Sequence, residues 1–198
     1  AAELNHLAFE AQNVASSFFT THDPEFELVF VTFMAKLNQQ VSLFLKYDLV
    51  ANHPLLKESA EQALTEIEAY DSNMKDVFAK WKTLGFSEEL GLQGEIRDEA
   101  HAIEAIFESI ESGNEIGLKS QLLLLSIRRA EKDYIQRLDD KYVSLVRLNI
   151  AELIQLSQSS FSASTNQAIQ SHLLKYKDAF DGFVSGREEV LNDEELVR

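Results

Sequence analysis

The chain has 198 residues, with 18 Lys and Arg against 33 Asp and Glu and a formal net charge of -15. No run of basic residues stands apart, so the cationic face that a nucleic acid needs is absent and nucleic acid is excluded as the expected partner. Seven glycines, two prolines and no cysteine favour an all-α protein without disulfides or thiol chemistry.

The first half of the chain predicts three helices in succession. Apolar residues recur at helical spacing up to Phe18, so the first helix is expected to end at about residue 20. Asp23 and Pro24 then provide an N-cap and a first-turn proline for a second helix. Asn52 and His53 interrupt that helix, and Pro54 opens the third.

The stretch LGFSEELGLQGE, residues 84–95, breaks the pattern with three glycines. Ser87 with the two Glu residues after it is expected to cap a new helix at once. That helix reaches about residue 112, where SGNEIG predicts a turn. A helical pattern then continues from Leu118 to about residue 157, with allowance for a bend at Asp139 and Asp140, and a last helix runs from about residue 165 to the end.

Helices of these lengths predict one elongated up-down-up-down rod, in which six helices form two stacked four-helix-bundle modules. The lower module is expected to take residues 1–20, 88–137 and 182–198. The upper module is expected to take residues 24–85 and 138–181. The alternative is a single uninterrupted bundle whose breaks are kinks.

Charged residues interrupt the apolar pattern in SIRRAEKDYIQRLDDKY, residues 126–142. One heptad seam is apolar at Leu118, Leu122 and Leu125 and then polar through Arg129, Lys132, Gln136 and Asp139. If this seam faces the bundle axis, its charges form a buried layer that needs partners.

Residues of the preceding helix that lie at the same level along the bundle axis add further cations to this layer. Counted from the SGNEIG turn, Arg97 lies level with Lys132, and His101 lies level with Arg128 and Arg129. Converging cations are costly unless an anion compensates them, which is the physical case for a carboxylate-binding site.

A neighbouring seam offers the opposite interpretation. Its residues are apolar throughout: Leu123, Ile127, Ala130, Tyr134 and Leu138. If this seam is the core, Arg129, Asp133 and Arg137 form a surface ladder of opposite charges. The run LLLL at 122–125 is apolar on all sides, which favours burial from more than one side, as in a homodimer.

Catalytic and metal motifs are not recognisable. The tetrapeptide DEAH at 98–101 occurs without GxxxxGK[ST], and the carboxylate-histidine spacing of Asp98 and His101 lacks the second motif that a di-iron bundle needs. No nucleophile-base-orienter set is present. The chain is therefore expected to have no catalytic residue, no metal site and no cofactor.

Three stretches together resemble the helical bimodular sensor domain of bacterial methyl-accepting chemotaxis proteins: LGFSEELGLQGEIRDEAHAIE (84–104), LLLLSIRRAEKDYIQRLDDKYV (122–143) and LLKYKDAFDGFV (173–184). The resemblance implies a periplasmic domain of an inner-membrane receptor, with transmembrane helices flanking it in the full-length protein. It implies a homodimer that binds a small organic acid through arginines and signals by helix displacement.

Carried onto this chain, the resemblance implies a ligand site at Arg97, His101, Arg128, Arg129, Lys132 and Arg137. The first helix has no arginine and offers Asn5, His6, Glu10 and Asn13 instead. A monocarboxylate, an amino acid or a weakly charged ligand therefore stays open beside a dicarboxylate.

Two other functions stay open. One is the sensor region of a histidine kinase or a cyclic-dinucleotide enzyme. The other is a structural helical bundle that binds a protein partner along an exposed apolar stripe.

Overall fold

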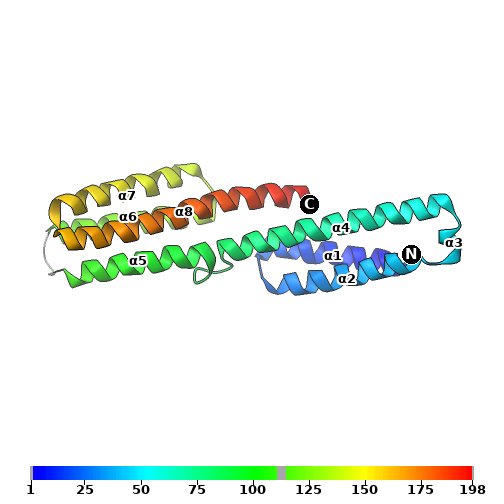
Figure 1. The fold of residues 1–198 in the computed structure, drawn as a ribbon. Coiled ribbons are helices and arrows are strands. Elements are labelled where there is room, and N and C mark those ends of the chain that lie inside the picture. Colours follow the sequence, from blue (N-terminus) through cyan, green and yellow to red (C-terminus); the bar gives the residue numbers. More distant parts are fainter. Residues whose placement is uncertain (1, 111–114, 198) are drawn as a thin grey trace. The chain divides into compact units, whose positions relative to one another are not determined.

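A computed structural model of the chain describes residues 2–110 and 115–197. Over these residues it has eight helices and no strand (Figure 1): α1 (Ala2–Thr21), α2 (Glu25–Phe44), α3 (Asp48–Ala51), α4 (Pro54–Leu84), α5 (Gly91–Ser109), α6 (Glu115–Arg137), α7 (Asp140–Ser160) and α8 (Ala163–Val197). The all-α class is confirmed, and the expected number of six helices is wrong. Residues 112–114 of the predicted SGNEIG turn lie outside the described part.

The chain divides into two compact units. Unit 1 contains residues 1–86 and 188–198, and unit 2 contains residues 87–187. This division differs from the expected modules, because the first helix shares a unit with residues 24–85. The expected stacking of modules into a rod stays a prediction.

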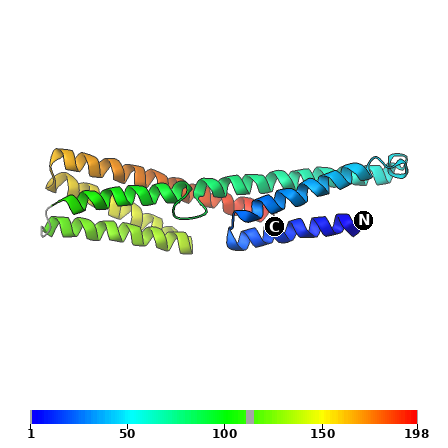
Figure 2. The same ribbon diagram turned by 90° about the horizontal axis from the view of Figure 1, so that it is seen from below.

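Two chain reversals explain the difference. His22 directly follows α1 and Leu138 directly follows α6, each with a φ of 52° in the left-handed region that non-glycine residues seldom adopt. After each reversal the next helix packs back on the previous one, so α1 pairs with α2 and α6 pairs with α7 (Figure 2). The prediction of one bent helix over residues 118–157 is wrong, because α6 and α7 are separate helices.

Helix starts follow the predicted capping chemistry only in part. The Asp23 carboxylate accepts a hydrogen bond from the Glu25 amide at 2.9 Å, as expected of a cap. Ser87 Oγ accepts weakly from the Glu89 amide at 3.4 Å. However, residues 87–90 form a turn and α5 begins only at Gly91.

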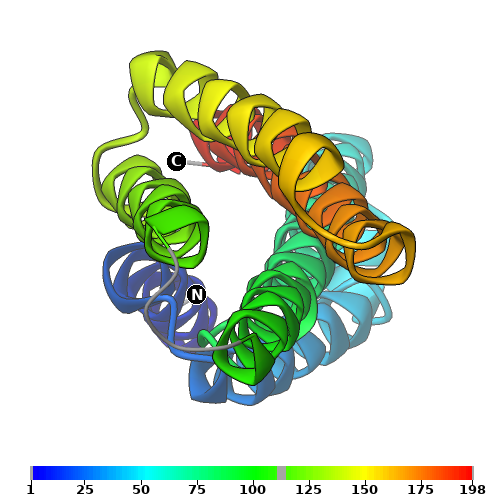
Figure 3. The same cartoon turned by 90° about the vertical axis from the view of Figure 1, so that its left-hand side faces the viewer.

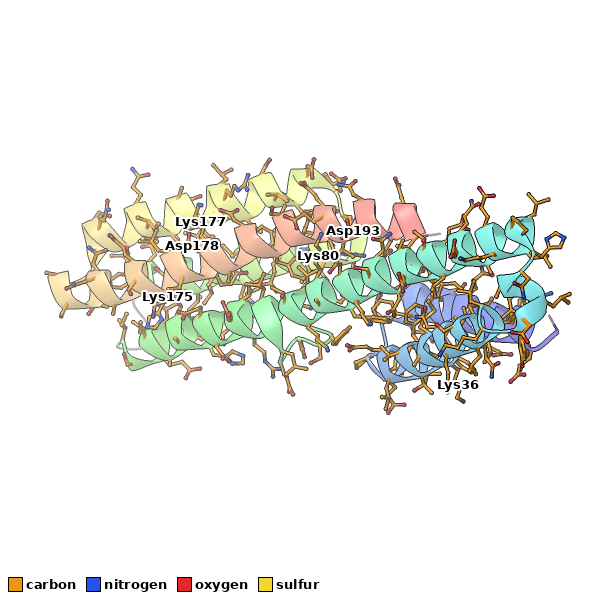
Figure 4. All side chains as sticks on the ribbon, turned by 45° about the vertical axis from the view of Figure 1, so that its right-hand side comes forward. Lys36, Lys80, Lys175, Lys177, Asp178 and Asp193 are labelled. Carbon is orange, nitrogen blue, oxygen red and sulfur yellow. The ribbon has the colours of Figure 1, made fainter. Side chains whose placement is uncertain are left out.

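Unit 1 has an aromatic core between α1, α2 and α4. The Phe78 ring lies 4.6 Å from the ring of Phe18 and 5.7 Å from that of Phe30, and all three side chains are fully buried. The end of α8 joins this unit through Asp193, whose carboxylate accepts a 2.6 Å hydrogen bond from Lys80 of α4 (Figure 4). Burying three aromatic rings contributes several kcal/mol, far more than such a part-exposed ion pair.

Unit 2 is a four-helix bundle of α5, α6, α7 and the part of α8 up to Arg187 (Figure 3). The core face of α6 carries Ile127, Ala130 and Tyr134, all at most 5 % exposed. On the other seam, Leu122 and Leu125 are more than half exposed. The second seam is therefore the core. Of the two interpretations that the sequence left open, the one in which Arg129 and Lys132 face the bundle axis is wrong.

Substitutions on the two faces of α6 test this assignment. Ile127→Ala removes buried methylene groups and leaves a cavity, so it should lower the free energy of unfolding by about 2–5 kcal/mol. Leu125→Ala removes a solvated side chain and should cost less than about 0.5 kcal/mol. Urea denaturation at concentrations where the chain is monomeric measures both values, and equal losses would contradict the assignment.

Candidate ligand-binding site

A charged pocket of about 170 Å³ lies in unit 2 between α5, α6 and the turn that precedes α5. Three of the six predicted site residues line it, namely Arg97, Arg128 and Lys132. The other five lining residues are Glu88, Gln93, Glu131, Ile135 and Gln136. The predicted convergence of cations from two helices is thus present, at the side of α6 rather than on the bundle axis.

The other predicted site residues lie elsewhere. His101, Arg129 and Arg137 are exposed and are not among the residues that line the pocket. Arg137 instead donates to the Tyr142 hydroxyl at 2.7 Å and lies 3.5 Å from Asp133. The second contact is one step of the surface ladder that the alternative seam predicted.

Glycines position the acidic turn at the mouth of the pocket. Gly91 has a left-handed φ of 56°, which lets the chain enter α5 directly after the turn. A Cβ on Gly94 would lie 2.8 Å from both the carbonyl carbon and the carbonyl oxygen of Glu89. Only glycine therefore allows the turn to pack this closely on α5, and the turn carries Glu88 and Glu89 toward Arg97.

The carboxylates of this turn pair with the pocket cations. Glu88 lies 3.7 Å from Arg97 and 3.6 Å from Lys132, and Glu89 lies 3.3 Å from Arg97. Arg97 and Lys132 thus share one carboxylate, which agrees with their predicted position at the same level along the bundle axis. Both glutamates are more than 60 % exposed, and ion pairs this exposed contribute at most about 1 kcal/mol each. A ligand can therefore displace them at small cost.

Arg128 is the least exposed cation of the pocket. Its side chain is 17 % exposed, and its Nε lies 3.6 Å from Glu131 Oε2, beyond hydrogen-bond length. Its Nη1 is buried and has no hydrogen-bond partner. A buried guanidinium nitrogen without an acceptor costs free energy, which a carboxylate that reaches this nitrogen would recover.

Glu131 is a buried carboxylate at the inner end of the pocket. It is 6 % exposed, and its Oε2 accepts a short hydrogen bond from the hydroxyl of the fully buried Tyr176 on α8. Burial raises the pKa of the Glu131 carboxyl above its ordinary value of 4.5, and the Tyr176 hydrogen bond and the Arg128 charge offset only part of this effect. The pocket is therefore linked through Glu131 to α8.

Glu131 and Tyr176 were not predicted to form a pair. Glu131 lies four residues after Ile127 and three before Tyr134, so helical spacing places it on the edge of the buried seam. A carboxylate at that position needs a buried donor. The Tyr-x-x-x-Phe pair of α8, Tyr176 and Phe180, was a visible signal for one.

A second pocket, of about 520 Å³, lies in unit 1 along α1. Its lining includes Gln12, Asn13, Ser16, Thr20 and Tyr70, and none of the described lining residues is Lys or Arg. Asn13 is one of the four polar residues that the first helix was expected to offer. This pocket therefore lacks the cations on which the carboxylate prediction rests.

Comparisons with known proteins add no assignment. No family model matches the chain, and a search of curated proteins finds no match either. Among the described residues, no helix has both the length and the low polarity that crossing a membrane requires.

Replacing Glu131 tests the buried carboxylate. The folded state holds the Glu131 proton more tightly than the unfolded state does, so its contribution to stability is fully present below pH 4.5 and is lost as the pH rises through the raised folded-state pKa. Glu131→Gln cannot ionise and keeps an acceptor for Tyr176.

The free energy of unfolding of Glu131→Gln, relative to the wild type, should therefore increase between about pH 4 and pH 7, by about 1.4 kcal/mol for each unit of pKa elevation. Chemical denaturation at several pH values measures this difference. Parallel pH profiles for the two proteins would contradict the assignment.

Proposed function

We propose that the chain is the ligand-binding region of a transmembrane chemoreceptor of the helical bimodular kind, and that it senses a small organic acid in unit 2. The observation that carries the proposal is the buried Arg128 Nη1, which lacks an acceptor on a side chain that lines a charged pocket. Arg97 and Lys132 approach the same pocket, and all three belong to the stretches that resemble this family.

The pocket is suited to a small ligand that carries a carboxylate. A void of about 150 Å³ holds a molecule the size of benzene, so a pocket of this volume takes a ligand of roughly six to ten non-hydrogen atoms. Guanidinium groups bind carboxylates through charge-assisted hydrogen bonds, which are about twice as strong as neutral ones. The Glu88 pairs with Arg97 and Lys132 keep the cations in place until a ligand replaces them.

The mechanism that we propose passes through Glu131. A carboxylate on Arg128 competes with Glu131 for the guanidinium, and Glu131 accepts the hydrogen bond of Tyr176 on α8. Ligand binding therefore changes the electrostatic environment of one buried contact between α6 and α8. We propose that α8 has two positions, and a ligand shifts the equilibrium between them only by its difference in affinity for the two states. The signal is then a displacement of α8 toward the position that the ligand-bound state favours.

Cellular placement follows from the same proposal. The receptor is an inner-membrane protein with this domain in the periplasm, and its membrane-spanning helices lie outside the present chain.

A histidine kinase or a cyclic-dinucleotide enzyme could use the same sensor region, because the ligand site is independent of the output domain. A structural bundle is the alternative function that the exposed leucines of α6 favour, and it predicts no stabilisation by small molecules.

Adjacent arginines provide a matched test of the site. A ligand at 100 times its dissociation constant should stabilise the chain by about 2.7 kcal/mol, which a thermal-shift screen of organic acids and amino acids detects. Arg128→Ala should weaken the binding of a hit by about 10- to 100-fold, because a charge-assisted hydrogen bond contributes about 1.5–3 kcal/mol. Arg129→Ala should leave the affinity unchanged, because Arg129 is exposed and lies outside the pocket lining.

Calorimetry on both variants gives the two affinities. Unchanged affinity in Arg128→Ala would refute the site. Equal losses in the two variants would show that only the overall charge of α6 matters.

The proposed receptor is a homodimer, and α6 offers a surface for it. Leu118, Leu122 and Leu125 lie on one face of α6 and are 55–60 % exposed, so they form an apolar stripe. Leu122→Glu places a charge in this stripe without touching the core of unit 2. Sedimentation velocity should therefore show a wild-type dimer, in the presence of ligand, that Leu122→Glu dissociates. A Leu122→Glu dimer as tight as that of the wild type would remove the stripe from the interface.

A further inference from the structure

Carboxylates already lie beside every cation of the pocket. Arg97 contacts Glu88 and Glu89, and Lys132 contacts Glu88. Arg128 lies 3.6 Å from Glu131. A ligand that carries only negative charge would therefore compete with these carboxylates for the same cations. A ligand that carries both signs would replace the pairs one by one.

Glu131 makes the binding of a bare carboxylate unfavourable. The Arg128 side chain that has an unpartnered nitrogen also lies 3.6 Å from the Glu131 carboxylate. A ligand carboxylate on that guanidinium would place two carboxylates around one cation in a largely buried position. Like charges this close repel strongly unless a proton or a second cation lies between them.

The positions of the charges match a ligand with adjacent groups of opposite sign. Arg128 and Glu131 are three residues apart on one helix, so their charged ends lie on one side of α6, at the same pocket. An α-amino acid has its ammonium group one carbon away from its carboxylate. The ammonium can donate to Glu131 while the carboxylate accepts from Arg128, and Glu88 at the mouth offers a second acceptor.

We propose that the pocket of unit 2 binds a small zwitterion, an α-amino acid, with Arg128 holding its carboxylate and Glu131 with Glu88 accepting hydrogen bonds from its ammonium group. This assignment rests on the proposed function, since it names the ligand class of the same site. The pocket volume of about 170 Å³ restricts the ligand to small members of the class.

Matched compounds separate the contributions of the two charged groups. Isothermal titration calorimetry on the whole chain uses glycine, alanine, serine, threonine, valine, asparagine and aspartate as the first panel. Each amino acid that binds is compared with its deaminated acid and its decarboxylated amine, as alanine is with propionate and ethylamine. We expect at least one amino acid to bind 10-fold or more tightly than both of its matched compounds.

Two variants assign the ammonium site. Glu131→Gln keeps the size of the side chain and an acceptor for Tyr176, and it should weaken amino-acid binding at least 10-fold while leaving the deaminated acid as tight as before or tighter. Glu88→Gln changes a side chain in the exposed turn, which puts the fold at little risk, and it should weaken amino-acid binding several-fold. Arg129→Ala is the control, with unchanged affinity for every compound.

The outcomes distinguish this inference from the proposed function. A deaminated acid that binds as tightly as its amino acid would overturn the zwitterion and leave a carboxylate sensor standing. Amino-acid binding that neither Glu131→Gln nor Glu88→Gln weakens would overturn the assignment of the ammonium site. If neither the amino acids nor any carboxylate binds, the proposed function fails as well.

Discussion

The buried hydrogen bond from Tyr176 to Glu131 is the interaction on which the account of this protein depends. It places a carboxylate where burial disfavours its charged form, and it fixes α6 against α8 at the height of the charged pocket. A buried carboxylate is tolerated only with donors and a compensating charge. Tyr176 supplies the donor, and Arg128 supplies the charge from 3.6 Å away. Whatever binds Arg128 therefore alters the balance at Glu131.

Helical spacing was sufficient to predict the class of fold but not the direction of the chain. Pro54 at the first position of α4 and the Asp23 carboxylate before α2 act as their residue types predict. The reversals at His22 and Leu138 carried no such signal, because a histidine and a leucine in left-handed backbone conformations are exceptions to local preference. Tertiary packing of the following helix stabilises them, and a single sequence does not display that packing. One bent helix over residues 118–157 was therefore expected where the α6–α7 hairpin occurs, and the break at residues 21–24 was placed without the reversal that pairs α1 with α2.

Counting residues along helices predicted heights in the site but not the directions of its side chains. Arg97 and Lys132 were placed level with each other, and both lie within 3.7 Å of Glu88. Arg128 and Arg129 were treated as equivalent, although successive residues on a helix point about 100° apart. Of these two arginines, only Arg128 lines the pocket. Glu131 was missed because glutamate is seldom buried, so its residue type predicts an exposed position. Its helical spacing, in contrast, places it beside the buried seam.

In the proposed mechanism, α8 responds to a ligand on Arg128 through Glu131 and Tyr176. Carbon-13 labelling of the tyrosine rings, followed by nuclear magnetic resonance during titration with the compound that binds best, observes this contact directly. We expect the Tyr176 ring resonance to shift with ligand occupancy, whereas that of the exposed Tyr47 in unit 1 should stay in place. A Tyr176 resonance that does not move at saturation would contradict the proposed mechanism.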